Sequence, residues 1–208
     1  MPRTLACIAA GLLALSGCGN EPRKPPTVTT PKAAFGWVDQ DIPTQGVKFQ
    51  RPSAWRYAPG TAPLLGTMSS GLTTIAVWRY PRDEKLPTTP EELDKARDAL
   101  VAAAKARDPS FKVIKAKGTR AAHSPAVVII ADETVAGQPR RVRSTHIYAA
   151  GSEVVVDAFA PADQYEKVEK PIIIPLVRTF KITQPSGAPG TQTTPTTPAT
   201  TTTTQTTG

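Results

Sequence analysis

The composition of both ends of this chain is unsuited to a folded core, so we expect any domain to lie in the middle of the sequence. Residues 183–208 are Thr, Pro, Gln, Gly, Ala and Ser, with no charged residue. Such a segment buries too little apolar surface to offset the entropy lost on ordering. Residues 18–33 are proline-rich and lack apolar periodicity, which is typical of an extended tether. We therefore predict one folded domain at 34–182, followed by a disordered tail that is either an O-glycosylated stalk or unmodified.

The amino-terminal segment, residues 1–17, has the layout of a secretory signal peptide. Arg3 precedes an uninterrupted apolar run, Leu5–Leu15, which small residues follow. The run is roughly half of the ~20 apolar residues that a membrane-spanning helix needs. The sequence therefore predicts export and removal of this segment.

The residues Leu15-Ser16-Gly17-Cys18 closely resemble the lipobox of bacterial lipoproteins. The resemblance implies cleavage between Gly17 and Cys18, and a mature protein whose first residue, Cys18, carries acyl chains such as palmitate. Each buried methylene contributes about 0.8 kcal/mol, so several chains would hold the protein firmly on the extracytoplasmic face of the cell membrane. A disulfide between Cys7 and Cys18 is the competing interpretation, but Cys7 lies in the segment that is removed.

Apolar patterning predicts an α+β domain. Alternation favours strands at 46–52, 53–57, 73–79 and 111–117, and the continuous apolar run at 126–131 favours a strand covered on both faces. Turns at 135–138 and 150–152 predict a meander of three antiparallel strands. Thr89, Pro90 and Glu92 predict a capping box that opens a helix ending at Asp108. A second helix from Pro161 is expected to kink or split at Pro171 and Pro175.

The order of these elements resembles a known fold. Gly-Val-x-Phe-x-x-Pro-x-x-Trp at 46–55 comes first, and Ala-Pro-x-x-x-Tyr at 160–165 and Thr-Phe-Lys at 179–181 close the pattern. This order is similar to that of the PsbP-like and DcrB-like family. The resemblance implies an antiparallel sheet with helices packed on its faces, a PsbP-like α/β/α sandwich. It also implies a binding or assembly factor, and it carries no shared catalytic residues.

The formal net charge of +8 raises the question of an anionic partner. Basic residues gather at 105–120 and again at Arg140, Arg141 and Arg143. An exported lipoprotein meets little nucleic acid and no aromatic-basic motif is present, so no nucleic acid is expected as a partner. One interpretation is that these arginines contact an anionic lipid, a wall polymer or an envelope protein; the other is a solvated basic surface without a specific partner.

No motif of an enzyme, cofactor or metal site stands out. Neither a Gly-x-Ser-x-Gly elbow nor a phosphate loop nor a His-Glu-x-x-His spacing occurs, and two Cys exclude a multi-cysteine zinc site. If the turn at 135–138 pairs its flanking strands, His146 lies near Val127 and several residues along from His123. A metal shared by the two histidines is therefore not expected.

These observations predict a membrane-anchored, extracytoplasmic, non-enzymatic binding or envelope-support protein without a cofactor. The alternative is a small-ligand carrier or a hydrolase that acts on cell-envelope material. That alternative requires polar groups that converge in a pocket, such as His146, Asp157 and an arginine in one concave site.

Overall fold

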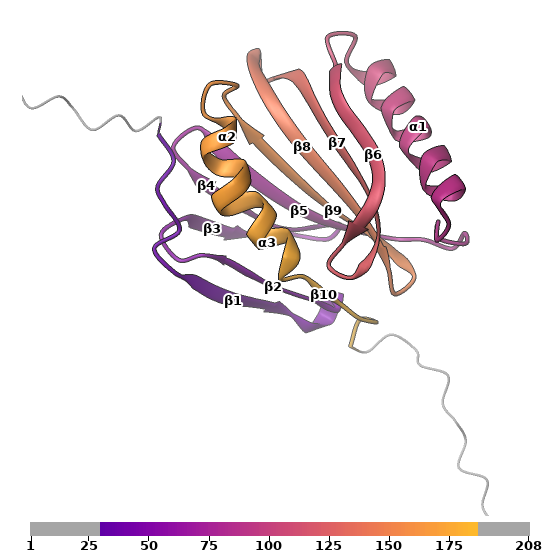
Figure 1. The fold of residues 1–208 in the computed structure, drawn as a ribbon. Helices are drawn as coiled ribbons and strands as arrows, with labels where there is room; N and C mark the ends of the chain where they lie inside the picture. Colours follow the sequence, from indigo (N-terminus) through magenta and orange to yellow (C-terminus); the bar gives the residue numbers. More distant parts are fainter. Residues whose placement is uncertain (1–29, 187–208) are drawn as a thin grey trace, which may run out of the picture.

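A seven-stranded antiparallel sheet forms the centre of the structure, a computed structural model that describes residues 30–186 (Figure 1). The strands lie in the order β3-β4-β5-β9-β8-β7-β6. Their bounds are β3 Arg56–Pro59, β4 Leu64–Ser70, β5 Thr73–Pro81, β6 Lys112–Ala121, β7 Ser124–Val135, β8 Gln138–Ala149 and β9 Ser152–Ala160. The predicted signal peptide and Cys18, with most of the tether and tail, lie outside the described residues.

A second, three-stranded antiparallel sheet packs beside the first. It consists of β1 (Trp37–Ile42), β2 (Val47–Pro52) and β10 (Lys181–Ile182), with the short 3-10 helix η1 (Pro43–Gln45) between β1 and β2. It therefore joins the first strands of the domain to its last strand, with β1 and β10 on either side of β2 (Figure 1).

Helices cover both faces of the large sheet. α1 (Pro90–Arg107) packs on one face, and the consecutive turns α2 (Tyr165–Val168), η2 (Glu169–Ile173) and α3 (Ile174–Arg178) pack on the other. Side chains alternate between faces along a strand, so Val127 and Ile129 of β7 pack with α1 while Ile130 packs towards the opposite helices. The prediction that residues 126–131 form a strand covered on both faces is confirmed.

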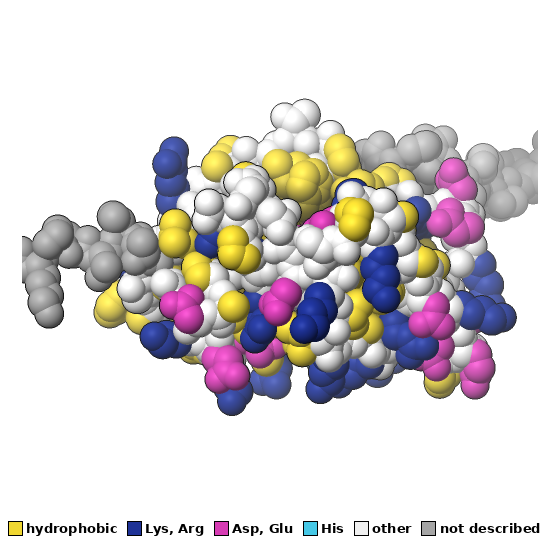
Figure 2. Space-filling model, turned by 90° about the horizontal axis from the view of Figure 1, so that it is seen from above, with side chains coloured by type: hydrophobic (Ala, Val, Ile, Leu, Met, Phe, Trp, Pro, Cys, Tyr) yellow, Lys and Arg dark blue, Asp and Glu magenta, His cyan; other side chains and the backbone are white. Residues whose placement is uncertain are grey.

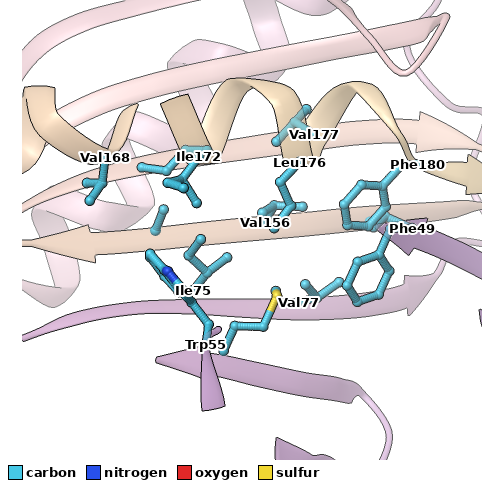
Figure 3. Packing of buried hydrophobic residues seen from close by; sticks show 14 of the residues in the cluster. Phe49, Trp55, Ile75, Val77, Val156, Val168, Ile172, Leu176, Val177 and Phe180 are labelled. Carbon is cyan, nitrogen blue, oxygen red and sulfur yellow. The ribbon is translucent and has the colours of Figure 1, made fainter. Parts of the chain in front are cut away.

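The larger core lies between the seven-stranded sheet, the small sheet and the α2–α3 segment. Figure 3 shows Val168, Ile172 and Leu176 directed from the helices towards Val156 of β9 and Ile75 of β5. At one end, the rings of Phe49 and Phe180 stack with centroids 4.7 Å apart. This contact joins β2 to the carboxyl-terminal segment. Among the described helices, none is both long and apolar enough to cross a membrane.

The start of α1 follows the predicted capping box. The backbone N–H of Glu92 donates to the Thr89 hydroxyl at 3.2 Å, and the backbone N–H of Thr89 donates to the Glu92 carboxylate at 3.1 Å. Gly118 lets the helix lie close to β6, because a Cβ atom there would be 2.9 Å from Cβ of Leu93. The predicted start and end of this helix are confirmed.

The second helical segment differs from the expectation. It begins at Tyr165 and not at Pro161, and its helical turns follow one another to Arg178 without a break. Pro171 lies in the π-helical turn η2, where the wider coil accommodates a residue that lacks the N–H an α-helix would use. Pro175 lies in the first turn of α3, and neither proline splits the segment.

Backbone contacts continue past both predicted domain boundaries. The N–H of Thr183 donates to Gly46 O at 2.8 Å, and the N–H of Ser186 donates to Pro43 O at 2.9 Å. At the other end, the indole N–H of Trp55 donates to Lys32 O at 2.9 Å. The folded part thus extends at least from Lys32 to Ser186, beyond the predicted 34–182.

Candidate functional site

The candidate site is a cavity beside α1, and it exists because one helix covers only part of a wide sheet. A helix with its side chains is about 10 Å wide, whereas neighbouring strands are about 4.8 Å apart. One helix therefore covers about two strands, and α1 packs mainly on β6 and β7. The same face of β8, β9 and β5 is left open next to the helix.

The cavity has a volume of about 280 Å³. Its helical wall includes Leu100 and Ala103 of α1, and its apolar lining continues with Phe111, Val142 and Phe159. The polar lining comes from five elements or their flanks and consists of Tyr80, Arg82, Arg107, Glu133, Ser144, His146, Glu153 and Asp157. The sheet thus supplies most of the polar groups.

Four of these side chains form one hydrogen-bonded chain. The Ser144 hydroxyl lies 2.5 Å from Oδ1 of Asp157 and 2.9 Å from Nε2 of His146. On the other side of the ring, Nδ1 of His146 lies 2.6 Å from Oε1 of Glu153. The second oxygen of Glu153 accepts from the guanidinium of Arg82. We call Asp157, Ser144, His146 and Glu153 the polar chain.

Strand register explains how the polar chain forms. Ser144 and His146 are two residues apart on β8, so their side chains lie on the same face. In the β8–β9 pairing, Ser144 lies opposite Asp157 and Tyr148 lies opposite Glu153. His146 pairs with Val127 of β7, as the turn at 135–138 predicts.

Glu153 is an ionised carboxylate held by two partners. Its side chain is only 3% exposed, and this burial opposes ionisation. The hydrogen bonds from His146 and Arg82 outweigh burial and hold the pKa of Glu153 below its usual value. Glu153 therefore fixes the orientation of the His146 ring.

Asp157 has the opposite balance. Burial raises the pKa of its carboxyl, and the hydrogen bond from Ser144 together with the charges of His146 and Arg107 offsets this effect only in part. Glu133 lies in the same cavity, and burial raises its pKa as well. The cavity thus contains two carboxyl groups that retain protons more readily than usual.

Two arrangements of the protons satisfy the polar chain. In the first, His146 donates from both ring nitrogens and Ser144 donates to the Asp157 carboxylate. In the second, a protonated Asp157 donates to Ser144, which donates to Nε2 of neutral His146. Both arrangements hold the same number of protons. Ser144 can therefore pass a proton between Asp157 and His146.

Arg107 adds a positive charge at the end of α1 nearest the cavity. It lies in the last turn of the helix, its side chain is exposed, and it makes no hydrogen bond or ion pair with another residue of 30–186. Its charge lowers the pKa of both Asp157 and Glu133. The guanidinium of Arg107 is therefore available to a ligand, whereas that of Arg82 is already bound to Glu153.

The three arginines predicted to contact an anionic partner, Arg140, Arg141 and Arg143, do not all lie on the same face of β8. Arg141 donates to Asp132 at 2.8 Å, and Arg143 donates to Glu169 at 2.7 Å. Arg140 lies on the opposite face from these two and approaches Leu72 O at 3.4 Å. On the face shown in Figure 2, basic and acidic side chains are interspersed. An anionic partner would have to displace carboxylates from two of the three arginines.

The histidines do not form a metal site in the part of the chain that the structure describes. His123 lies in the tight turn between β6 and β7 with a positive φ of 63°, whereas His146 lies in the cavity. No group of three or more His, Cys, Asp or Glu side chains within residues 30–186 is arranged to hold a metal ion.

Sequence reasoning identified His146 and Asp157 but missed Ser144 and Glu153. The signal was present in the turn at 150–152, since a hairpin closed there puts Ser144 opposite Asp157. The cavity itself could not be predicted from the sequence, because it depends on which strands α1 covers.

No protein-family model and no curated protein matches the sequence. Among solved structures, the cyanobacterial PsbP, CyanoP, of Synechocystis sp. PCC 6803 is similar, with a TM-score of 0.52 and 13% sequence identity. The match covers 81% of this chain and 98% of CyanoP. This fold is PsbP-like. The predicted α+β class, with helices on both faces of an antiparallel sheet, is confirmed.

Two other solved structures are similar at lower scores. The Ran-binding protein Mog1p of Saccharomyces cerevisiae has a TM-score of 0.49 and 8% identity, over 72% of this chain and 96% of its own. LpqN, involved in cell envelope biogenesis of Mycobacterium tuberculosis, has a TM-score of 0.47 and 16% identity, over 71% and 91%. A PsbP-like fold does not by itself define a function.

Proposed function

We propose that this chain is a lipid-anchored extracytoplasmic protein that binds a small ligand in the α1 cavity. Cys18 supplies the anchor, and the proline-rich segment that follows it separates the domain from the bilayer. The proposal combines the lipid anchor that the lipobox implies with a small-ligand carrier, the alternative that requires a concave site. One observation carries it: His146, Asp157 and two arginines line a single cavity.

The volume of the cavity limits the ligand. At about 280 Å³, the cavity is at the lower end of the ~300–1,000 Å³ typical of sites for drug-sized ligands. The ligand we propose is therefore a small polar molecule with a short apolar part, and not a peptide or a lipid chain.

The energetics of the polar chain favour a binding role over a purely structural one. A carboxyl whose pKa is raised by burial weakens the fold at neutral pH, so Asp157 is costly where it stands. Perturbed titratable groups that converge in a cavity are typical of functional sites. An apolar side chain in place of Asp157 would pack against its apolar neighbours without that cost.

Intact-mass measurement tests the anchor. In cells that express the full chain, Cys18→Ala is expected to leave the signal peptide uncut and to abolish lipidation. The wild-type protein should have a mass that begins at Cys18 and includes acyl chains, and the variant should have the mass of the uncut chain without them. An unmodified mass at Cys18 in the wild type would contradict the lipoprotein assignment.

A cavity-filling substitution tests the binding site. Ala103 and its neighbour Ala102 are both exposed on α1, but only Ala103 lines the cavity. Ala102 therefore serves as the control position. Small amino acids, hydroxy acids and esters are screened by thermal shift on the full chain in detergent. A ligand at 100 times its dissociation constant adds about 2.7 kcal/mol of stability.

The two tryptophan variants give opposite expectations. Ala103→Trp should abolish the ligand-induced rise in Tm, and Ala102→Trp should retain it. The absence of any stabilising compound, or an equal response from both variants, would contradict binding in the cavity.

A further inference from the structure

We propose that the polar chain is a hydrolytic site in which Ser144 is the nucleophile and His146 its general base, acting on small acyl esters. The inference rests on the proposed function for its cavity, and it adds chemistry to binding. Glu153 is a positioning residue, since it holds the imidazole and does not reach Ser144.

The geometry matches the arrangement that activates a serine. Serine nucleophiles lie within about 2.6–3.2 Å of their base, and the base is oriented by a third group on its other ring nitrogen. Here the Ser144–His146 distance is 2.9 Å and the His146–Glu153 distance is 2.6 Å. All three side chains line the same cavity. Such an arrangement is recognised by its geometry, and it recurs on unrelated folds.

Asp157 decides whether the serine is ready to react. When Asp157 is ionised, Ser144 donates to it and His146 has no free lone pair at Nε2. When Asp157 holds the proton, Ser144 donates to Nε2 and His146 can act as the base. Burial, which favours the protonated carboxyl, shifts the chain towards this second arrangement. No Gly-x-Ser-x-Gly elbow is present, and Glu153 lies on a different strand from Ser144 and His146, so the sequence did not reveal this arrangement.

The remaining lining suits a short acyl ester. Leu100, Phe111, Val142 and Phe159 offer an apolar surface for the acyl group. Arg107 lines the same cavity and has no partner within the described residues, so its guanidinium is the available cation for the oxyanion of a tetrahedral intermediate. The volume of about 280 Å³ favours short acyl groups.

The reaction balances without a cofactor. Oγ of Ser144 forms a bond to the carbonyl carbon of the ester, and its proton passes to Nε2 of His146. The ester C–O bond breaks, and His146 returns the proton to the departing alcohol. Water then attacks the acyl-serine with the same base, releasing the carboxylic acid and restoring the Ser144 hydroxyl.

A fluorophosphonate probe tests the nucleophile directly in the full-length protein in detergent. The expected result is covalent labelling, with the modified residue mapped to Ser144 by mass spectrometry, and turnover of p-nitrophenyl acetate. Ser144→Ala should reduce labelling and turnover at least 100-fold. The matched control is Ser124→Ala, which removes a serine outside the cavity and should change neither.

A second variant separates positioning from folding. Glu153→Gln keeps an oxygen that can accept from His146 but removes the charge that stabilises the imidazolium. We expect it to lower kcat more than tenfold with little change in KM, while thermal unfolding remains cooperative.

Failure of this inference is distinguishable from failure of the proposed function. If the probe leaves Ser144 of the wild-type chain unmodified, or maps to another residue, hydrolysis is overturned even if Ser144→Ala does not fold. A stabilising compound that Ala103→Trp no longer binds would still establish the cavity as a binding site.

Discussion

On folding, the Asp157 carboxylate is withdrawn from water, and within the described residues it accepts one hydrogen bond, from Ser144. Glu153, also in the polar chain, is buried and yet keeps its charge, because it accepts hydrogen bonds from both His146 and Arg82. Its two cationic partners distinguish Glu153 from Asp157. A proton on the second carboxylate oxygen of Asp157, or a hydrogen bond from a ligand to it, would therefore stabilise this carboxyl most.

Replacement of Asp157 by Asn is expected to stabilise the protein at pH 7. The folded pKa of Asp157 lies above its unfolded value of 3.8, so the ionised carboxyl weakens the fold at neutral pH. This cost fades as the pH falls through the folded pKa towards 3.8, because the folded state then binds the proton more tightly. The Asn amide can donate to Ser144 without any charge.

Thermal unfolding of both proteins over a pH series checks this expectation. Each kcal/mol corresponds to about 2–4 °C in a chain of this size. The rise in Tm from Asp157→Asn should be largest near neutrality and vanish below about pH 3.5. A destabilised variant at pH 7 would mean that the charge of Asp157 supports the fold.

At the scale of elements, α1 both forms one wall of the cavity and ends in Arg107. Its start is defined locally, by the reciprocal bonds between Thr89 and Glu92. The hydrogen bond from Lys85, followed by those from the backbone N–H groups of Thr88 and Thr89, lowers the pKa of Glu92 to about 2. Glu92 therefore remains ionised at neutral pH.

Removal of the cap should destabilise the protein by a predictable amount. Thr89→Ala deletes the oxygen that accepts from the backbone of Glu92, and such changes cost about 1 kcal/mol. Thr89→Ser keeps that oxygen and serves as the control. Urea denaturation should show a lower midpoint for the alanine variant alone. Equal midpoints for both variants would show that the cap contributes nothing to global stability.

Elements defined by neighbouring residues were predictable, and elements defined by docking were not. The capping box of α1 and the hairpin turns follow from short sequence patterns, and the turn at 135–138 correctly placed His146 beside Val127. The same register pairs Arg141 with Asp132, which the charge pattern alone did not reveal. The π turn at Pro171 depends on packing against the sheet, which no local pattern encodes.

At the scale of the whole molecule, the two ends of the domain are joined through the small sheet. Arg79 of β5 is 3% exposed and donates to Gln45 O, to Ala150 O at 3.2 Å and to Thr183 O at 3.0 Å. This buried cation therefore connects η1, the β8–β9 turn and the segment after β10. The composition of residues 183–186 resembles the tail, so the sequence did not reveal that they complete this contact.

Shortening the chain tests that connection. A chain that ends at Ile182 loses the Thr183 acceptor of Arg79 and the backbone bonds of Thr183 and Ser186 to the η1 turn. Because hydrogen bonds to charged groups contribute about 1.5–3 kcal/mol, it should be about 2 kcal/mol less stable than a chain that ends at Ser186. Chemical denaturation of both chains gives the comparison. Equal stability would show that residues 183–186 are not part of the folded unit.

We propose that this protein meets its ligand in the cavity beside α1 and not on the basic surface of β8. NMR chemical-shift mapping of the full chain in detergent, with a stabilising small molecule, distinguishes the two surfaces. We expect the largest shifts at Ser144, His146, Asp157 and the last turns of α1. Shifts confined to Arg140, Arg141 and Arg143 or to the opposite face of the sheet, with none in the cavity, would contradict it.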